Sequence, residues 1–319
     1  LPMQQQACGD MEFLAPLLAL LGGPVGASLC SALGMPTGAA SILGSEVKRQ
    51  LPRAYRWLNL LEQLVLEYDI EITVINEDVL CDCKLLAMWS RRYDIPVLQI
   101  EHAASILRAY NGEDNYSTDV AVFGSRSAEY FRDLGLAPEQ IHIIGNPAWD
   151  AYVNLVYQRE NLRISLGALH GITPSDIWFV LGTSWNAHLS ALDNRNFIDQ
   201  AKIACGALKE IIDGGLRSAV FIVKDRLVSD AIESKLAQLK AVAGDFGVAD
   251  HVFYVVDDAK NWIAAADAVI SFDSNLSIES VLAGVPAVNI ITEFGAFVGS
   301  AFSSDDGILS VESAELGAS

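Results

Sequence analysis

The chain has 319 residues, about twice a typical domain, so we expect two domains, and its hydrophobic fraction of 51% is enough for two cores. Its 21 basic and 40 acidic residues give a formal net charge of −19, which argues against a nucleic-acid polymer as partner because phosphate contacts require clustered Lys and Arg. A single small anion bound at a helix end stays compatible with this charge.

The cysteines and the most apolar segment argue against other classes. Five cysteines are an odd number, and Cys81 and Cys83 lack a second Cys or His pair that would complete a zinc site, so reduced thiols are expected. Residues 13–34 are interrupted by Pro and Gly and have no basic flank, which predicts neither a membrane span nor a signal peptide. Because the chain opens at Leu1, we expect trimmed ends, with which membrane-targeting segments could be lost.

The first half alternates helical and strand patterns. Residues 1–45 are rich in Gly and Ala, and helical pieces are favoured there. The spacing of apolar residues then predicts helices over 46–68, 80–93 and 125–134 and strands over 70–75, 96–100, 119–123 and 141–144. A βα repeat of this kind predicts a parallel sheet.

The second half continues the alternation. A linking helix is predicted over 150–166, and residues 171–175 are the best candidate boundary. We predict an α/β protein with two Rossmann-like parallel-sheet domains, 1–150 and 151–319, facing across a cleft. The predicted elements of the second domain are strands over 177–181, 219–223, 251–255, 268–272 and 287–291 and helices over 197–212, 229–242, 261–266 and 276–283.

The stretch 264–291 predicts a βαβ unit that could bind a ligand. Asp273, Ser274 and Asn275 follow an apolar strand and are residue types favoured at helix N-caps, while Gly284 ends the helix. The turn lies at the carboxyl end of a strand, where open α/β sheets bind ligands. A diphosphate at this helix end and a ribose diol on Glu279 would suit it, although an ordinary capped helix with an exposed Glu explains the pattern about as well.

The faces of this helix follow from its spacing. Ile278, Val281 and Leu282 share the face predicted to lie on the sheet, while Asn275 and Glu279, four residues apart, share another.

Three sequence pieces carry a resemblance to a known superfamily. They are VFGSRSAEYFRDLGLAPEQIHIIGNPAWD at 122–150, VLQIEHAAS at 97–105 and DAVISFDSNLSIESVLAGVPAVNI at 267–290. In this order the chain resembles the GT-B superfamily, which includes nucleotide-sugar glycosyltransferases, UDP-N-acetylglucosamine 2-epimerases, and bacterial capsule and teichoic-acid polymer transferases. The likeness runs from about residue 70 to residue 291.

The resemblance implies roles for some of these residues. Ser274 and Ser277 would hold the donor diphosphate, and Glu279 would hold the ribose. Two departures are visible. Ala103 replaces the glycine of the family's Q-H-G strand end, and the K-x-H-P strand end reads Lys224, Asp225, Arg226 and Leu227, without its histidine.

His102 and Glu101 are the candidate catalytic residues. His102 follows an apolar strand, where an imidazole could accept a proton from a hydroxyl or bind phosphate, and the plainer alternative is a loop histidine bonded to backbone. Glu101 competes for the role of base, because alternation along a strand points the two side chains in opposite directions. Lys224 could neutralise a diphosphate, or it could be a surface lysine.

Further polar residues follow other strands. Thr183, Ser184 and His188 could contact phosphate or sugar, but a capped turn explains them better. Residues that could approach the nucleobase or sugar are Asn289, Thr292 and Glu293.

The expected function is glycosyl transfer without a metal or other cofactor, from a nucleotide-sugar donor to a glycan or lipid-linked acceptor in bacterial surface-polysaccharide assembly. The alternatives are a nucleotide-sugar 2-epimerase and a non-catalytic nucleotide-sugar-binding domain. We expect the protein to lie in the cytoplasm, which includes the inner face of the membrane. Segments outside this chain could provide peripheral membrane association. No hydrolase triad order, P-loop, HExxH or G-x-G-x-x-G is present.

Overall fold

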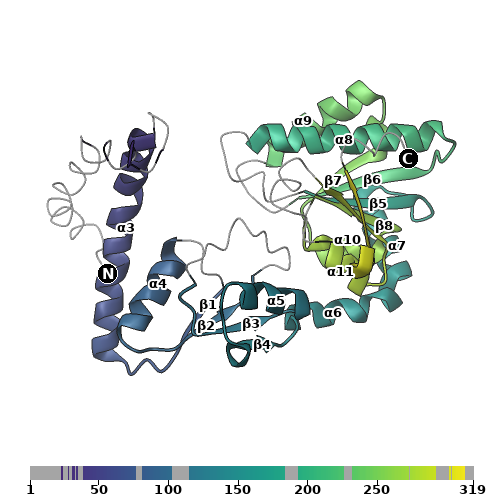
Figure 1. The fold of residues 1–319 in the computed structure, drawn as a ribbon. Coiled ribbons are helices and arrows are strands. Elements are labelled where there is room, and N and C mark those ends of the chain that lie inside the picture. The colour runs from purple at the N-terminus through teal and green to yellow at the C-terminus, as the bar shows by residue number, and fades with distance from the viewer. Residues whose placement is uncertain are drawn as a thin grey trace. The chain divides into compact units, whose positions relative to one another are not determined.

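The computed structural model describes residues 39–76, 81–102, 115–183, 193–225, 232–272, 274–291 and 304–312, together with positions 23, 28, 31, 32, 34 and 302. The chain divides into two compact units, with the division between Ile143 and Ile144 (Figure 1). Each unit is built around a parallel sheet, which confirms the predicted α/β class. Within the described residues no helix is long and apolar enough to cross a bilayer.

The first unit contains a four-stranded parallel sheet in the order β1-β2-β3-β4. Apolar side chains of the helices pack against it, as in the buried cluster of Ile75, Ala87 and Val97. The elements are α3 (Ala39–Glu67), β1 (Thr73–Ile75), α4 (Cys81–Arg92), β2 (Val97–Ile100), β3 (Asp119–Val122), α5 (Ser125–Asp133), η1 (Pro138–Gln140) and β4 (Ile141–Ile143).

The second unit contains a six-stranded parallel sheet in the order β10-β9-β8-β5-β6-β7. Every residue of β6 is buried, as expected for a central strand with helices on both faces. The strands are β5 (Ile177–Gly182), β6 (Ala219–Lys224), β7 (Val252–Val255), β8 (Ala268–Ser271), β9 (Ala287–Ile291) and β10 (Ile308–Glu312).

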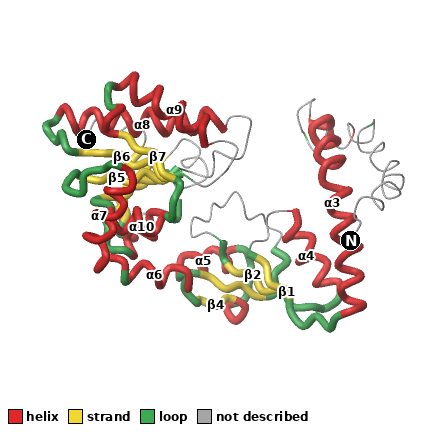
Figure 2. The backbone as a smooth tube through the Cα atoms, turned by 180° about the vertical axis from the view of Figure 1, so that it is seen from behind, coloured by secondary structure: helices red, strands yellow, loops and turns green. Residues whose placement is uncertain are grey.

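Helices cover both faces of the second sheet. Figure 2 shows α8 (Asp193–Asp213) and α9 (Ile232–Phe246) on one face and α7 (Arg159–His170) and α10 (Ala259–Ala265) on the other. The remaining helices of this unit are η2 (Pro147–Trp149), α6 (Asp150–Val153), η3 (Leu155–Gln158), η5 (Ala249–His251), α11 (Leu276–Leu282) and η6 (Ser304–Asp306).

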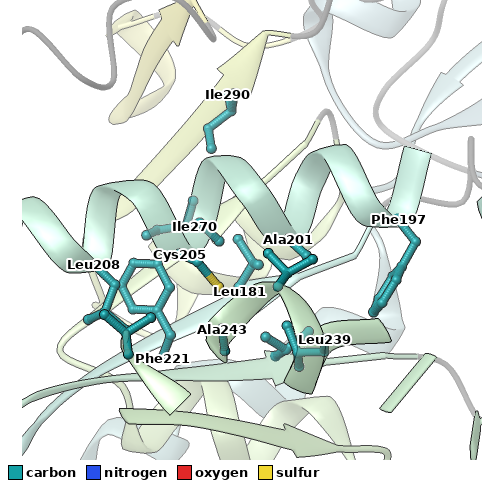
Figure 3. Close-up of a cluster of buried hydrophobic side chains, with 14 of the residues drawn as sticks. Leu181, Phe197, Ala201, Cys205, Leu208, Phe221, Leu239, Ala243, Ile270 and Ile290 are labelled. Carbon is teal, nitrogen blue, oxygen red and sulfur yellow. The ribbon is translucent and has the colours of Figure 1, made fainter. Parts of the chain in front are cut away.

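The larger core lies between α8, α9 and the sheet. Phe197 and Leu208 of α8 are almost fully buried and pack with Leu181 and Phe221 of the sheet (Figure 3). Cys205 lies in the same cluster, where burial raises the pKa of its thiol to about 11 and so disfavours the reactive thiolate.

The predicted linking helix over 150–166 is wrong as a single element, because the structure has α6, η3 and α7 there. All three lie in the second unit, as do residues 171–175. Arg159 and Arg163 of α7 donate to Asp267 at 2.5 Å and 2.9 Å, and the Arg163 guanidinium lies 4.6 Å from the centre of the Trp178 ring. These contacts attach α7 to the amino-terminal edge of the second sheet.

The edge strand β10 was not predicted. It pairs with β9 in parallel, with Ile308 opposite Ala287, and both residues are buried together with Phe302.

Candidate functional site

The carboxyl edge of the second sheet holds most of the predicted site residues. From β5 the strand order runs outward in both directions, to β6 and β7 on one side and to β8, β9 and β10 on the other. The point between β5 and β8 is therefore a topological switch point, the usual location of ligands in open α/β sheets. The register places Ser271 and Lys224 on either side of Gly182, and Asn289 beside Ser271, in one row across this edge.

The turn between β8 and α11 lies at the switch point. Ser274 is half-buried, and its hydroxyl accepts a weak hydrogen bond from the Leu276 N–H at 3.4 Å. Asn275 is the N-cap residue but makes no side-chain capping bond. Asp273 lies outside the described residues.

Ser277 supports this turn from inside the protein. Its side chain is fully buried, and its hydroxyl lies 2.7 Å from that of Ser271. Ser271 in turn lies 3.5 Å from the Asn289 side-chain oxygen. These buried contacts link the turn to the ends of β8 and β9.

The predicted faces of α11 are partly wrong. Val281 and Leu282 were expected on the sheet, but each is 36% exposed, and the fully buried residues of the helix are Ser277 and Ser280. The Ser280 hydroxyl donates to the Val285 carbonyl at 2.9 Å. Small side chains with satisfied hydroxyls therefore face the sheet, which apolar periodicity does not reveal.

Glu279 lies one turn into α11 and has two aromatic partners. The Tyr152 hydroxyl donates to its carboxylate at 2.8 Å, and the Trp149 indole also hydrogen-bonds it. Burial raises the pKa of Glu279, although the hydrogen bonds and the nearby Lys260 oppose this shift. Burial and the neighbouring carboxylate together raise the pKa of Tyr152.

Lys224 ends β6 and is buried, with its ammonium donating to the carbonyl of Asp225. The Asp225 carboxylate is also buried and accepts from the Thr183 hydroxyl at 2.7 Å, the Lys235 ammonium at 2.9 Å and the Tyr254 hydroxyl at 2.7 Å. This Asp225 network joins the ends of β5, β6 and β7 to α9. Ser184, His188, Thr292 and Glu293 lie outside the described residues.

Glu101 and His102 follow β2 in the first unit and differ in environment. Glu101 is buried and accepts from the Phe123 N–H and the Ser127 hydroxyl, both at 2.6 Å. Burial raises its pKa despite these bonds. His102 is exposed, and its Nδ1 lies 3.4 Å from the Asn76 side-chain nitrogen.

Solved structures of other proteins resemble this one. HepE from Anabaena, in complex with UDP and glucose, has 17% identity and a TM-score of 0.51 over 82% of this chain and 69% of its own. A glycosyltransferase from Rickettsia africae has 12% identity and a TM-score of 0.55 over 83% of this chain and 68% of its own. The fold is of the GT-B type.

A UDP-N-acetylglucosamine 2-epimerase from Rickettsia bellii shares the GT-B fold, with 13% identity and a TM-score of 0.52 over 75% of this chain and 61% of its own. No protein-family model and no curated protein matches the sequence. The GT-B likeness is therefore one of fold.

The sequence did not predict four residues of the second unit that hold side chains at the carboxyl edge of its sheet. Tyr152 and Trp149 follow the GNP motif at 145–147, and this proximity is the signal that could have pointed to them. Asp225 follows the apolar strand β6 and forms a buried ion pair with Lys235 of α9, a pairing ten residues apart that neither residue's sequence neighbours indicate. Among the described residues no group of three or more His, Cys, Asp or Glu is arranged to hold a metal ion.

Proposed function

We propose that this protein is a GT-B glycosyltransferase that moves a sugar from a nucleotide donor to a glycan or lipid-linked acceptor in bacterial surface-polysaccharide assembly. The observation that carries the proposal is the switch point of the second sheet, where the turn at Ser274 leads into α11 and the Glu279 carboxylate lies one turn into that helix. The fold likeness to HepE, solved in complex with UDP-glucose, supports a nucleotide sugar as donor.

The donor would be held at the carboxyl edge. Ser274 and Asn275, and with them Asp273, would meet the diphosphate, and Glu279 would accept hydrogen bonds from the ribose. Ser277 would contribute from beneath the turn, since its hydroxyl is bonded to Ser271. The scheme uses no cofactor, because the helix end and Lys224 would stabilise the negative charge that develops on the leaving diphosphate.

Lys224 would stabilise that leaving charge. Its ammonium donates to the Asp225 carbonyl, so it would turn toward the diphosphate to contact it. Its place two strands from Ser274, at the same edge of the sheet, supports this role.

His102 would accept the proton of the acceptor hydroxyl. It is exposed at the carboxyl edge of the first sheet, whereas both oxygens of Glu101 already accept internal hydrogen bonds. This difference supports His102 as the base and gives Glu101 the role of fixing the turn between β3 and α5.

A donor panel tests the proposal. Thermal shifts with UDP, CMP, CDP, GDP and TDP compounds should identify one that stabilises the protein, by about 2.7 kcal/mol at a hundred times its dissociation constant. Glu279→Ala should weaken that binding by about 1.5 to 3 kcal/mol, the range for a hydrogen bond to a charged group, while Glu210→Ala, an exposed carboxylate of the same unit, should not.

Product analysis then decides the reaction. Sugar transfer to an acceptor supports the proposal. Conversion of the donor to its 2-epimer would favour the epimerase that the Rickettsia bellii likeness keeps in view, and binding without turnover would favour a non-catalytic domain. Absence of nucleotide binding would refute all three.

A further inference from the structure

The Glu279 carboxylate is already oriented by the segment that opens the second unit. Tyr152 belongs to α6 and Trp149 to η2, a few residues after the division between the units. The Tyr152 side chain is only 3% exposed, so its hydroxyl has little access to water, and it donates to Oε2 of Glu279. A residue 127 positions away in the sequence therefore fixes one oxygen of this carboxylate.

We propose that Tyr152 is a positioning residue for ribose recognition: its hydroxyl, assisted by the Trp149 indole, holds Glu279 so that the remaining acceptor positions of the carboxylate face a ribose diol. This inference rests on the proposed function, because it assumes that Glu279 meets the ribose of the donor.

The hydrogen-bonding capacity of the carboxylate supports this assignment. An ionised carboxylate offers about four acceptor positions, and it donates nothing. Tyr152 and Trp149 occupy two of them, which leaves about two for the 2′- and 3′-hydroxyls of a ribose. The two protein donors and the two ribose hydroxyls together would fill the acceptor positions of the Glu279 carboxylate.

The proposed arrangement also predicts specificity. A carboxylate held in one rotamer does not have to be ordered when the ligand binds, so the cost of fixing it is already met by the fold. A site built to accept hydrogen bonds from ligand hydroxyls rejects analogues that lack them, because its buried polar groups are then left unpaired. Tyr152 would therefore increase the preference for ribonucleotides over 2′-deoxyribonucleotides.

A purely structural role for Tyr152 makes a different prediction. The Lys260 ammonium lies 6.0 Å from the centre of its ring, and Tyr152 belongs to the buried cluster with Trp178 and Trp262. If the hydroxyl only attached α6 to the domain, its removal would lower thermal stability and weaken every ligand by the same factor.

The test compares each of UDP, CDP and GDP with its 2′-deoxy counterpart by calorimetry on the whole chain. Tyr152→Phe removes only the hydroxyl and should weaken ribonucleotide binding about five- to tenfold, as expected for one hydrogen bond, while deoxyribonucleotide binding changes less than about twofold. Tyr157→Phe, in η3 and 86% exposed, is the matched control and should change neither.

The Glu279→Ala variant separates failure of this inference from failure of the proposed function. If Glu279→Ala abolishes the ribose preference and Tyr152→Phe leaves it intact, the inference is wrong and the ribose contact stands. Equal losses for both sugars in Tyr152→Phe would also overturn it. If no nucleotide binds the unaltered protein, or Glu279→Ala keeps the preference, the ribose contact itself fails. The double variant should lose no more than Glu279→Ala alone.

Discussion

The carboxyl edges of the two sheets each place a buried carboxylate directly after a strand, but the two carboxylates have different partners. Glu101, after β2, is held by neutral donors, the Phe123 N–H and the Ser127 hydroxyl. Asp225, after β6, is held by the Lys235 ammonium and two hydroxyls. Glu101 can take up a proton without leaving an unpaired charge in the protein. Loss of the Asp225 carboxylate, by contrast, would leave the buried Lys235 ammonium without a counter-charge.

Removing Asp225 tests this difference most strongly. Asp225→Ala should lower the free energy of unfolding by about 3 to 5 kcal/mol, because Lys235, whose side chain is only 8% exposed, would be left as an unpaired buried charge. Urea unfolding measures the effect, and Asp245→Ala, an exposed carboxylate on the same helix as Lys235, is the control.

A second substitution sharpens this result. Adding Lys235→Met to Asp225→Ala should restore part of the stability, since neither buried charge remains. If Asp225→Ala lowers the free energy of unfolding by less than about 1 kcal/mol, the Asp225–Lys235 pair does not stabilise this edge of the sheet.

Loss of the exposed His102 side chain should affect turnover more than the free energy of unfolding. On the proposed function, His102→Ala lowers turnover by about a hundredfold, as expected for a lost proton acceptor, with nucleotide affinity unchanged. Steady-state kinetics and calorimetry measure the two quantities. His142→Ala replaces another exposed histidine of the same unit and should leave both near their starting values.

An exchange of roles between Glu101 and His102 as proton acceptor would give a different result. If Glu101→Gln abolishes turnover and His102→Ala does not, Glu101 is the base, and its two internal hydrogen bonds must then open during turnover.

The smallest expected effect is the pH dependence that Glu101 gives to stability. Burial raises its pKa above the ordinary value of 4.5, so the folded protein retains a proton that the unfolded chain has released. The contribution of Glu101 to the free energy of unfolding therefore falls as pH rises from about 4.5 through the raised pKa, and is level beyond it.

Urea unfolding over a pH series measures this slope. Glu101→Gln should lack this part of the pH dependence, while Glu129→Gln, on the exposed side of α5, should retain it. The same slope in both variants would mean that Glu101 does not hold its proton in the folded state.

Local sequence patterns predicted the β8–α11–β9 unit almost to the residue. Strands buried on both faces give continuous apolar runs, and Gly284 has a left-handed φ of +70° that few other residues adopt, so it ended the predicted helix in the right place. The alternating exposure of Glu101 and His102 follows from the two-residue period of a strand, although the sequence does not tell which of them is buried.

Long-range pairing explains what local patterns missed. In β10, Leu309 is 60% exposed and the run is only five residues long, so the strand depends on its pairing with β9 more than on its own hydrophobicity. The partners of Glu279 come from a segment 127 residues earlier, which no short-range spacing can indicate.

The switch point has a consequence for how the second unit folds. Its two flanking strands, β5 and β8, are joined by pairs such as Phe179 with Ala268, and the adjacent hydrogen bond from the Trp178 N–H to Asp267 spans 89 residues. Closing so long a loop costs entropy before any contact repays it, and folding slows as pairings become less local. We therefore expect the carboxyl edge of the second sheet to be among the last parts of the molecule to assemble.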